Sequence, residues 1–242
     1  MVYDSKRSRR KSLTIVTTTD PREKNIYNLI LSLKKLKGKE DFDLEILIVD
    51  DLKLWGSPKE IPRFISGVEV KVIWNSESVG QLEAITSGMM VASTDIVLTI
   101  DPDMHQFVDR ITDMMHNLDG HTRIVHAVRS HRPNIPLIRK IGSFLINKIA
   151  RTVGGINIAD IGSSMVLVDK KTMTDLKKAP SGINKKLYLY KKHQKNIKTI
   201  NLVEMERTRF TSQYSLTMLI KLFYSTTVEL IRIRLRDSYK EK

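Results

Sequence analysis

The amino-terminal half of the chain alternates short β-branched runs with segments of helical spacing. Runs suited to strands occupy residues 12–19, 43–51, 68–75 and 95–103, and helical patterns occupy residues 25–36 and 80–93. Apolar strands of this length, separated by helices, favour a mostly parallel sheet with helices on both faces. The sequence therefore predicts an α/β fold.

Three of the predicted strands end in polar side chains. These are Thr17, Thr18 and Thr19 after the first strand, Asp50 and Asp51 after the second, and Asp101 and Asp103 after the fourth. In open parallel sheets, ligands bind beyond the carboxyl ends of the strands. We therefore expect these hydroxyl and carboxylate groups to meet at one edge of the sheet and to form a binding site.

The Asp-Pro-Asp sequence at residues 101–103 carries the most specific chemistry. Two carboxylates separated by one rigid residue are hard oxygen ligands, suited to a Mg²⁺ or Mn²⁺ ion that also accepts phosphate oxygens. His105 or Gln106 could complete the ligand set. The alternative is a polar turn that merely ends the strand. Carboxylates at the end of a second strand favour the metal site.

Composition narrows the class of partner. The chain has 242 residues, 41% of them apolar, which is enough for one large domain with a buried core. It has no cysteine, which excludes disulfides, cysteine-ligated zinc and thiol catalysis. A net charge of +14 indicates a polyanionic partner: nucleic acid, anionic lipid or a phosphorylated substrate. No nucleic-acid-binding module is recognisable and aromatic content is only 6%, so we expect no nucleic-acid partner.

The second half is more basic and less regular. Residues 128–155 read as a basic loop followed by an amphipathic helix, residues 163–173 as a return strand and turn, and residues 197–215 as a strand leading into a polar loop. We expect a basic tail at residues 1–11, one domain at 12–215 and an amphipathic helical segment at 216–242. No apolar signal-peptide region follows the tail, and no stretch reaches the roughly 20 apolar residues that a membrane span needs.

Several segments, in order, resemble the family 2 inverting glycosyltransferases with a GT-A-type nucleotide-sugar-binding fold. They are SLTIVTTT, EILIVDD, SVGQLEAITSGMMVASTDIVLTIDPDMH and IADIGSSMVLVD. The segment RTRFTSQYSL at 207–216 is similar to the closing segment of the polyprenyl-phosphate glycosyltransferases. That group includes dolichyl-phosphate mannose synthase and its bacterial undecaprenyl-phosphate relatives. The resemblance covers residues 12–225, nearly the whole chain.

The resemblance implies roles for individual residues. For binding the nucleoside-diphosphate sugar, UDP- or GDP-linked, it implies Thr18, Asp50, Asp51, Gly80 and Asp101. For binding Mg²⁺ or Mn²⁺ it implies Asp101, Asp103 and His105. For binding phosphate groups and the acceptor it implies Arg139, Ser143, Arg207 and Ser212. The candidate catalytic residues are Asp103, Asp160 and Arg129.

The chain also departs from the family pattern. TTTDPRE follows the first strand, Phe210 replaces a glycine, and Gln213 replaces a lysine of the closing segment. The family resemblance therefore does not identify the donor sugar.

The acceptor is inferred from a missing base. A sugar hydroxyl needs a general base to become a nucleophile, whereas a phosphate monoester is already anionic and needs cations instead. The Glu-Asp pair typical of hydroxyl-directed relatives does not occur after residue 103, and arginines are available at 129, 132, 139 and 207. Asp160 is the remaining candidate base, or alternatively a partner to an arginine.

The preferred hypothesis is transfer to a polyprenyl phosphate or another lipid-linked acceptor. The alternatives are a glycan or glycolipid hydroxyl acceptor and a catalytically silent nucleotide-sugar-binding subunit. Residues 216–242 mix apolar and basic side chains, which suits a helix lying on an anionic membrane surface. The alternative is a helix packed on its own domain or on a partner in a homo-oligomer. We expect a cytoplasmic protein, peripheral on the inner face of the cell membrane.

Overall fold

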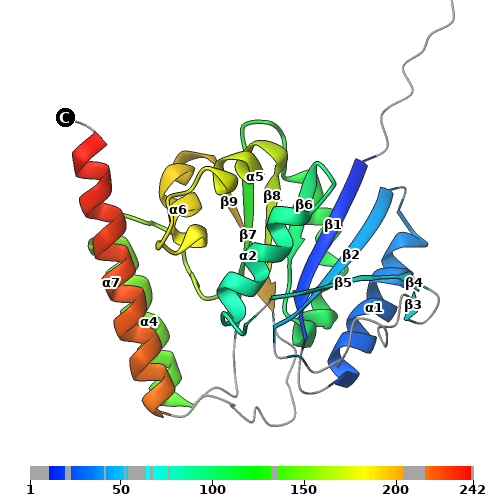
Figure 1. Ribbon diagram of the computed structural model, residues 1–242, viewed down its shortest axis with the longest axis horizontal. Helices are drawn as coiled ribbons and strands as arrows, with labels where there is room; N and C mark the ends of the chain where they lie inside the picture. Colours follow the sequence, from blue (N-terminus) through cyan, green and yellow to red (C-terminus); the bar gives the residue numbers. More distant parts are fainter. Residues whose placement is uncertain are drawn as a thin grey trace, which may run out of the picture. The chain divides into compact units, whose positions relative to one another are not determined.

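The computed structural model describes residues 11–19, 23–40, 42–51, 53, 64–65, 68–75, 77–131, 136–203 and 216–240. The chain divides into two compact units, Met1–Ile111 and Thr112–Lys242, which are described separately (Figure 1).

The first unit is built on a parallel sheet. Its strands are β1 (Lys11–Thr18), β2 (Phe42–Asp50), β5 (Lys71–Trp74) and β6 (Ile96–Thr99). Their order is β5-β2-β1-β6, and every pairing between neighbours is parallel. Residues 13–17 of β1 are all buried, although successive side chains point to opposite faces, so both faces of β1 are covered. The predicted parallel sheet is confirmed.

The helices of this unit follow the predicted spacing. They are α1 (Glu23–Lys37), α2 (Gln81–Val91) and the short 3₁₀ helix η2 (Pro102–Phe107). Helix α2 lies close to the sheet because Gly88 has no side chain, and a Cβ atom there would lie 2.4 Å from Val16 Cγ1. The predicted strand at 68–75 is interrupted at Val70. Its first residues instead form β4 (Val68–Glu69), which pairs antiparallel with β3 (Phe64–Ile65).

The second unit contains three strands and most of the remaining helices. The strands are β7 (Ile124–His131), β8 (Val166–Asp169) and β9 (Ile197–Val203). The helices are α3 (Arg110–His116), whose first two residues belong to the first unit, α4 (Leu137–Thr152), α5 (Lys170–Lys177), α6 (Lys185–Lys192), the short η3 (Gln194–Asn196) and α7 (Leu216–Lys240). Strand β7 pairs antiparallel with β8 and parallel with β9.

Two sequence predictions in this unit were wrong. Residues 128–131, predicted as the start of a basic loop, are the end of β7, where Arg129 pairs in register with Leu202 of β9. The polar side chains of this segment obscured the strand pattern. The turn predicted after β8 is helix α5, which begins there because the Asp169 side chain accepts a hydrogen bond from the backbone N–H of Thr172 at 2.7 Å.

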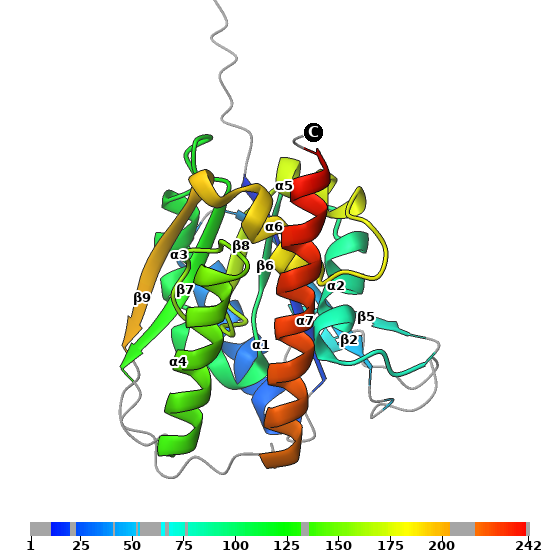
Figure 2. The same ribbon diagram turned by 90° about the vertical axis from the view of Figure 1, so that its left-hand side faces the viewer.

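Helices α4 and α7 lie side by side (Figure 2). Leu230 of α7 is fully buried and lies against Gly154, where a Cβ atom would be 2.6 Å from Leu230 Cδ2. Arg234 Nη1 donates to the carbonyl oxygens of Thr152 and Val153, so a cation caps the negative end of α4. Helix α7 is thus fastened to α4 along one face. Among the described residues, no helix combines the length and apolar character needed to cross a bilayer.

Candidate functional site

Parallel pairing brings the polar strand ends of the first unit to one edge. Thr18 pairs with Val49 and Asp50 pairs with Trp74, while the backbone N–H of Ile100 donates to the Val16 carbonyl. Strands β1, β2, β5 and β6 therefore end together. The predicted convergence of hydroxyl and carboxylate groups at one sheet edge is present in the structure.

Two residues on the first two strands lie deep in this edge. Asp50 is fully buried, and its Oδ1 accepts a hydrogen bond from Thr19 Oγ1 at 3.0 Å. Thr18, the predicted donor contact, is also buried. Among the described residues, Thr17 Oγ1 and Trp74 Nε1 are buried without a hydrogen-bond partner, and both lie near the ends of their strands. The Thr17 hydroxyl belongs to the group of side chains predicted at this edge, whereas sequence reasoning missed Trp74 Nε1, because an apolar run gives no sign of which atoms remain unpaired.

Asp51 is engaged entirely by the chain that follows β5. Its carboxylate accepts four hydrogen bonds, from Asn75 Nδ2, Ser78 Oγ and the backbone N–H groups of Val79 and Gly80, at 2.9 to 3.0 Å. Burial opposes ionisation of this carboxyl, but the four donors outweigh it and lower its pKa. Asp51 thus anchors the residues before α2, and its predicted contact with the nucleotide stays a prediction.

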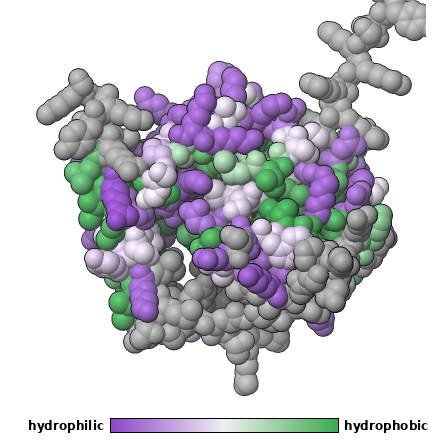
Figure 3. All heavy atoms as spheres, viewed as in Figure 1, coloured by the Kyte–Doolittle hydropathy of each residue, from purple (hydrophilic) through white to green (hydrophobic). Residues whose placement is uncertain are grey.

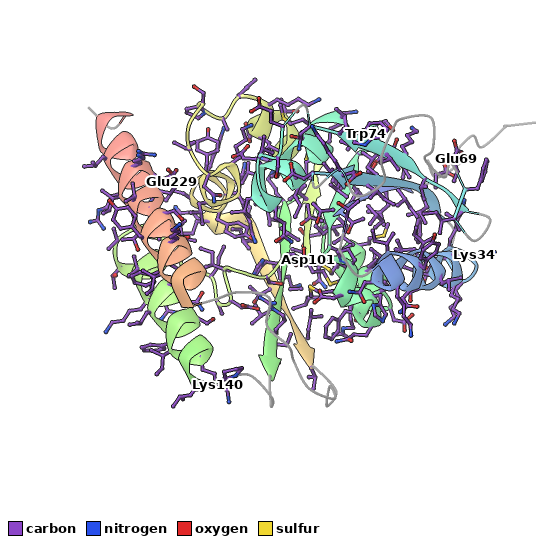
Figure 4. The ribbon with its side chains drawn as sticks, turned by 60° about the horizontal axis from the view of Figure 1, so that its bottom comes forward. Lys34, Glu69, Trp74, Asp101, Lys140 and Glu229 are labelled. Carbon is purple, nitrogen blue, oxygen red and sulfur yellow. The ribbon has the colours of Figure 1, made fainter. Side chains whose placement is uncertain are left out.

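The Asp-Pro-Asp segment leads directly from β6 into η2. Asp101, labelled in Figure 4, is the residue that precedes the helix, and Asp103 lies in its first turn. Gln81, the first residue of α2, donates from Nε2 to Asp101 Oδ1 at 2.6 Å. Both aspartates are partly exposed. A carboxylate pair at a solvent-accessible strand end is therefore in place.

The Asp101 and Asp103 carboxylates suit a cation that also binds oxygen atoms of a substrate. Within the described residues, no three Asp, Glu or His side chains gather to hold a metal ion by themselves. Mg²⁺ commonly binds one or two carboxylates and completes its shell with water and substrate phosphates, so Asp101 and Asp103 fit such an ion. His105 Nδ1 lies 3.2 Å from the Pro102 carbonyl oxygen, and its role as a third ligand stays a prediction.

The second unit holds a separate charged pair, Arg129 and Asp160. Arg129 donates to the Asp160 carboxylate from Nε at 2.8 Å, from Nη2 at 3.0 Å and from its backbone N–H at 3.1 Å. Such a bidentate contact fixes the plane of the guanidinium. Asp160 has a φ of 48°, an uncommon conformation for a residue other than glycine. The bend in the chain at Asp160 thus coincides with the contact to Arg129.

A buried polar cluster supports the bend. The Asp160 carbonyl oxygen lies 3.0 Å from His126 Nε2 and accepts the Ser163 backbone N–H at 2.8 Å. The Tyr190 hydroxyl lies 2.8 Å from His126 Nδ1, and Lys186 Nζ donates to carbonyl oxygens of the same turn. Burial, and next the positive charge of Lys186, lower the pKa of His126 to about 3. His126 is therefore neutral at physiological pH, with Nε2–H as donor and Nδ1 as acceptor.

The remaining predicted site residues are placed only in part. Arg139 and Ser143 lie on α4 rather than in a loop; Ser143 is half-buried, and the side chain of Arg139 lies outside the described part of the structure. Arg207 and Ser212 also lie outside the described residues.

Solved structures with a similar fold are GT-A glycosyltransferases. Glucosyl-3-phosphoglycerate synthase from Mycobacterium tuberculosis, in complex with Mn²⁺ and UDP-glucose, has a TM-score of 0.65 at 16% identity, over 93% of this chain and 79% of that chain. Mannosyl-3-phosphoglycerate synthase from Rubrobacter xylanophilus has a TM-score of 0.63 at 16% identity, over 95% and 75%. At such identities the likeness shows the fold alone, and it confirms the predicted GT-A-type fold.

The profile of glycosyl transferase family 2 matches residues 14–176, more than half of the chain, and the protein belongs to this family. Curated relatives include the undecaprenyl-phosphate 4-deoxy-4-formamido-L-arabinose transferase of Pectobacterium atrosepticum, 26% identical over 74% of this chain and 55% of the relative. They also include the uncharacterized glycosyltransferase YkcC of Bacillus subtilis, 26% identical over 71% and 53%. The chain thus spans about half the length of the curated relatives it matches.

The neutral His126 makes stability depend on pH. Its folded pKa is lowered from 6.5 to about 3, so its contribution is complete above pH 6.5 and is lost as the pH falls from 6.5 toward 3. Between pH 7 and pH 5, we expect the wild type to lose about 2 kcal/mol more unfolding free energy than His126→Gln. Urea denaturation followed by circular dichroism measures the difference. Parallel pH profiles for the two proteins would show that the ring is not held neutral.

Proposed function

We propose that the protein is a divalent-metal-dependent inverting glycosyltransferase. It transfers a sugar from a nucleoside-diphosphate sugar to a polyprenyl phosphate at the cytoplasmic surface of the membrane. Family membership supports the sugar transfer. Several curated relatives are undecaprenyl-phosphate 4-deoxy-4-formamido-L-arabinose transferases by name, which supports the acceptor.

The binding site for the nucleoside-diphosphate sugar is assigned to the strand ends of the first unit. Asp101 and Asp103 would hold Mg²⁺ or Mn²⁺, and the ion would supply positive charge to the departing diphosphate. Asp50, Thr18 and the unpaired hydroxyl of Thr17 line the ends of the neighbouring strands, where a nucleoside would bind. Gly80 is one of the residues that Asp51 anchors, so both act by shaping the donor site.

The choice of acceptor rests on the hydrogen bonds that the Asp160 carboxylate already accepts. Both carboxylate oxygens accept hydrogen bonds from Arg129, so this aspartate holds a guanidinium in place instead of standing ready to remove a proton. A hydroxyl acceptor would require a base, whereas an anionic phosphate requires a fixed cation. The pair is therefore better suited to binding a phosphate acceptor than to activating an alcohol.

In the proposed reaction, an oxygen of the acceptor phosphate forms a bond to the anomeric carbon of the sugar. The bond between that carbon and the donor diphosphate breaks on the opposite side, and the nucleoside diphosphate leaves. Arg129 orients the anionic acceptor and Asp160 positions Arg129. Arg139, Ser143, Arg207 and Ser212 remain predicted phosphate contacts.

The exposed faces of α4 and α7 support a membrane surface as the place of reaction. Large apolar side chains at helical spacing are exposed on both helices: Leu137, Ile141, Phe144 and Leu145 on α4, and Ile220, Tyr224, Ile231 and Leu235 on α7. Lys140, at the start of α4 in Figure 4, Lys148 and Lys221 are exposed on the same helices. Figure 3 shows hydrophobic and hydrophilic surface interleaved at the left-hand edge, where α7 and α4 lie in Figure 1. Such helices suit the interface of an anionic bilayer.

Turnover tests the proposed reaction. Release of UDP or GDP is measured from a panel of UDP- and GDP-sugars with Mn²⁺ or Mg²⁺, with undecaprenyl phosphate, with a sugar hydroxyl acceptor, or with no acceptor. We expect release that undecaprenyl phosphate stimulates and EDTA abolishes. Asp103→Asn should lower the rate on the order of 100-fold or more, because a metal ion contributes several kcal/mol to charge stabilisation.

The arms of this assay separate the alternatives. Release stimulated only by a hydroxyl acceptor would overturn the lipid phosphate, and no release under any condition would favour a silent binding subunit. A normal rate for Asp103→Asn would overturn the metal assignment. Gln194→Ala, a change at an exposed side chain of the second unit, serves as the control and should keep the wild-type rate.

Vesicle binding tests the membrane surface. Phe144 and Phe64 are both 65% exposed, but only Phe144 lies on the apolar face of α4. Phe144→Glu should weaken co-sedimentation with phosphatidylglycerol vesicles roughly 10-fold or more, because burying a phenylalanine contributes about 1.5–3 kcal/mol. Phe64→Glu, the matched control, should bind as the wild type does. Equal effects of the two substitutions, or no vesicle binding by the wild type, would contradict this surface.

A further inference from the structure

Gln81 contacts the first carboxylate of the candidate metal site, and nothing in the sequence pattern assigned it a role. Its Nε2 atom lies 2.6 Å from Asp101 Oδ1, a short hydrogen bond to a charged acceptor. The Gln81 side chain is exposed. It does not fill the core, so the contact has no evident packing purpose.

Asp101 accepts this hydrogen bond from Gln81 and does not cap the helix that follows it. It occupies the position that precedes η2, with φ −73° and ψ 144°, where an aspartate side chain commonly accepts a backbone N–H of the first turn. No such capping hydrogen bond is formed by Asp101. The carboxylate instead accepts the hydrogen bond from Gln81 at the start of α2.

Asp51 fixes the position of Gln81 indirectly, through the residues that precede it. The four hydrogen bonds that Asp51 accepts hold Asn75 and residues 78–80, the last of which immediately precedes Gln81, at the end of β2. Gly80, the last of these residues, has φ 86° and ψ 156°, a backbone conformation essentially restricted to glycine. The start of α2 therefore has a defined position relative to β2, and Gln81 projects from it.

The chemistry of the contact suits support of a metal ligand. An amide donates a hydrogen bond without carrying charge, so it can orient the Asp101 carboxylate and leave its negative charge for a cation. A lysine or arginine at position 81 would neutralise the carboxylate and repel the ion. Outer-sphere donors of this type commonly fix the orientation of metal-ligating side chains.

We propose that Gln81 is a positioning residue for the divalent cation: its Nε2–H fixes Asp101 so that the cation binds together with the nucleoside diphosphate. The residues anchored by Asp51 place Gln81 for this task. This inference rests on the proposed function, since it requires a metal ion at Asp101 and Asp103.

Mn²⁺ binding tests the proposal without relying on turnover. Mn²⁺ is titrated into the full chain with saturating UDP, or with GDP if UDP does not bind. The concentration of free Mn²⁺ is measured by electron paramagnetic resonance. Gln81→Met, which keeps the length of the side chain and removes its N–H donor, should weaken Mn²⁺ binding roughly 10- to 100-fold. Gln194→Met, the same change at an exposed site in the second unit, is the matched control and should bind Mn²⁺ as the wild type does.

A second measurement separates positioning from direct contact with the nucleotide. Affinity for the nucleoside diphosphate is measured in EDTA by calorimetry, and the midpoint of thermal unfolding is measured for each variant. We expect Gln81→Met to match the wild type in both. Equal loss of nucleotide affinity with and without metal would show that Gln81 contacts the nucleotide itself, and would overturn the positioning role.

The outcomes distinguish this inference from the proposed function. If the wild type binds Mn²⁺, Asp103→Asn does not, and Gln81→Met binds within twofold of the wild type, only the role of Gln81 is overturned. If the wild type binds no Mn²⁺ with nucleotide, or Asp103→Asn binds it equally well, the metal assignment itself is overturned and the role of Gln81 with it.

Discussion

The parallel pairing of β1 with β2 and β6 is the constraint on which the candidate donor site depends. Because these strands run in the same direction and in fixed register, their carboxyl ends stop at one edge. Polar side chains that lie far apart in the sequence, at Thr18, Asp50 and Asp101, are brought to that edge by backbone hydrogen bonds alone. The tight approach of α2 at Gly88 keeps the helix against the same strands. The chemistry of the site is thus set by the sheet before any ligand binds.

Aspartates in this protein perform two different tasks. Asp51 and Asp160 are enclosed by donors, four from the residues before α2 and three from one arginine, and they act by fixing other groups in place. Asp101 and Asp103 lie at a partly exposed strand end, where a cation could reach them. A carboxylate that already accepts three or four hydrogen bonds has few lone pairs left for a ligand. Asp51 and Asp160 are therefore less suited than an exposed carboxylate to binding a cation directly.

Much of the fold could be predicted from the sequence, because the first unit follows simple periodicity. The run at residues 46–49 is apolar and rich in β-branched side chains, as a buried strand requires, and both ends of α1 lie within two residues of the predicted bounds. The second unit was harder. Strand β7 contains His126 and Arg129, whose polar side chains find partners within the unit, and α5 depends on a cap at Asp169. Tertiary partners of this kind leave no periodic signal.

The candidate site was predictable at the level of residue type and less so at the level of role. The Asp-Pro-Asp pair follows from its place after a strand. The four donors around Asp51 come from a segment whose shape depends on Gly80, and the bond between Gln81 and Asp101 joins residues 20 positions apart. Sequence spacing cannot reveal either contact, because both depend on how α2 is seated on the sheet.

The location of a bound metal ion tests the central claim most directly. Crystals of the protein grown with Mn²⁺ and a nucleoside diphosphate would give an anomalous difference map that identifies the ion without ambiguity. The account predicts a peak within coordination distance of the Asp101 or Asp103 carboxylate and of the diphosphate oxygens. A nucleotide bound without any peak there, or a peak at a different set of residues, would contradict it.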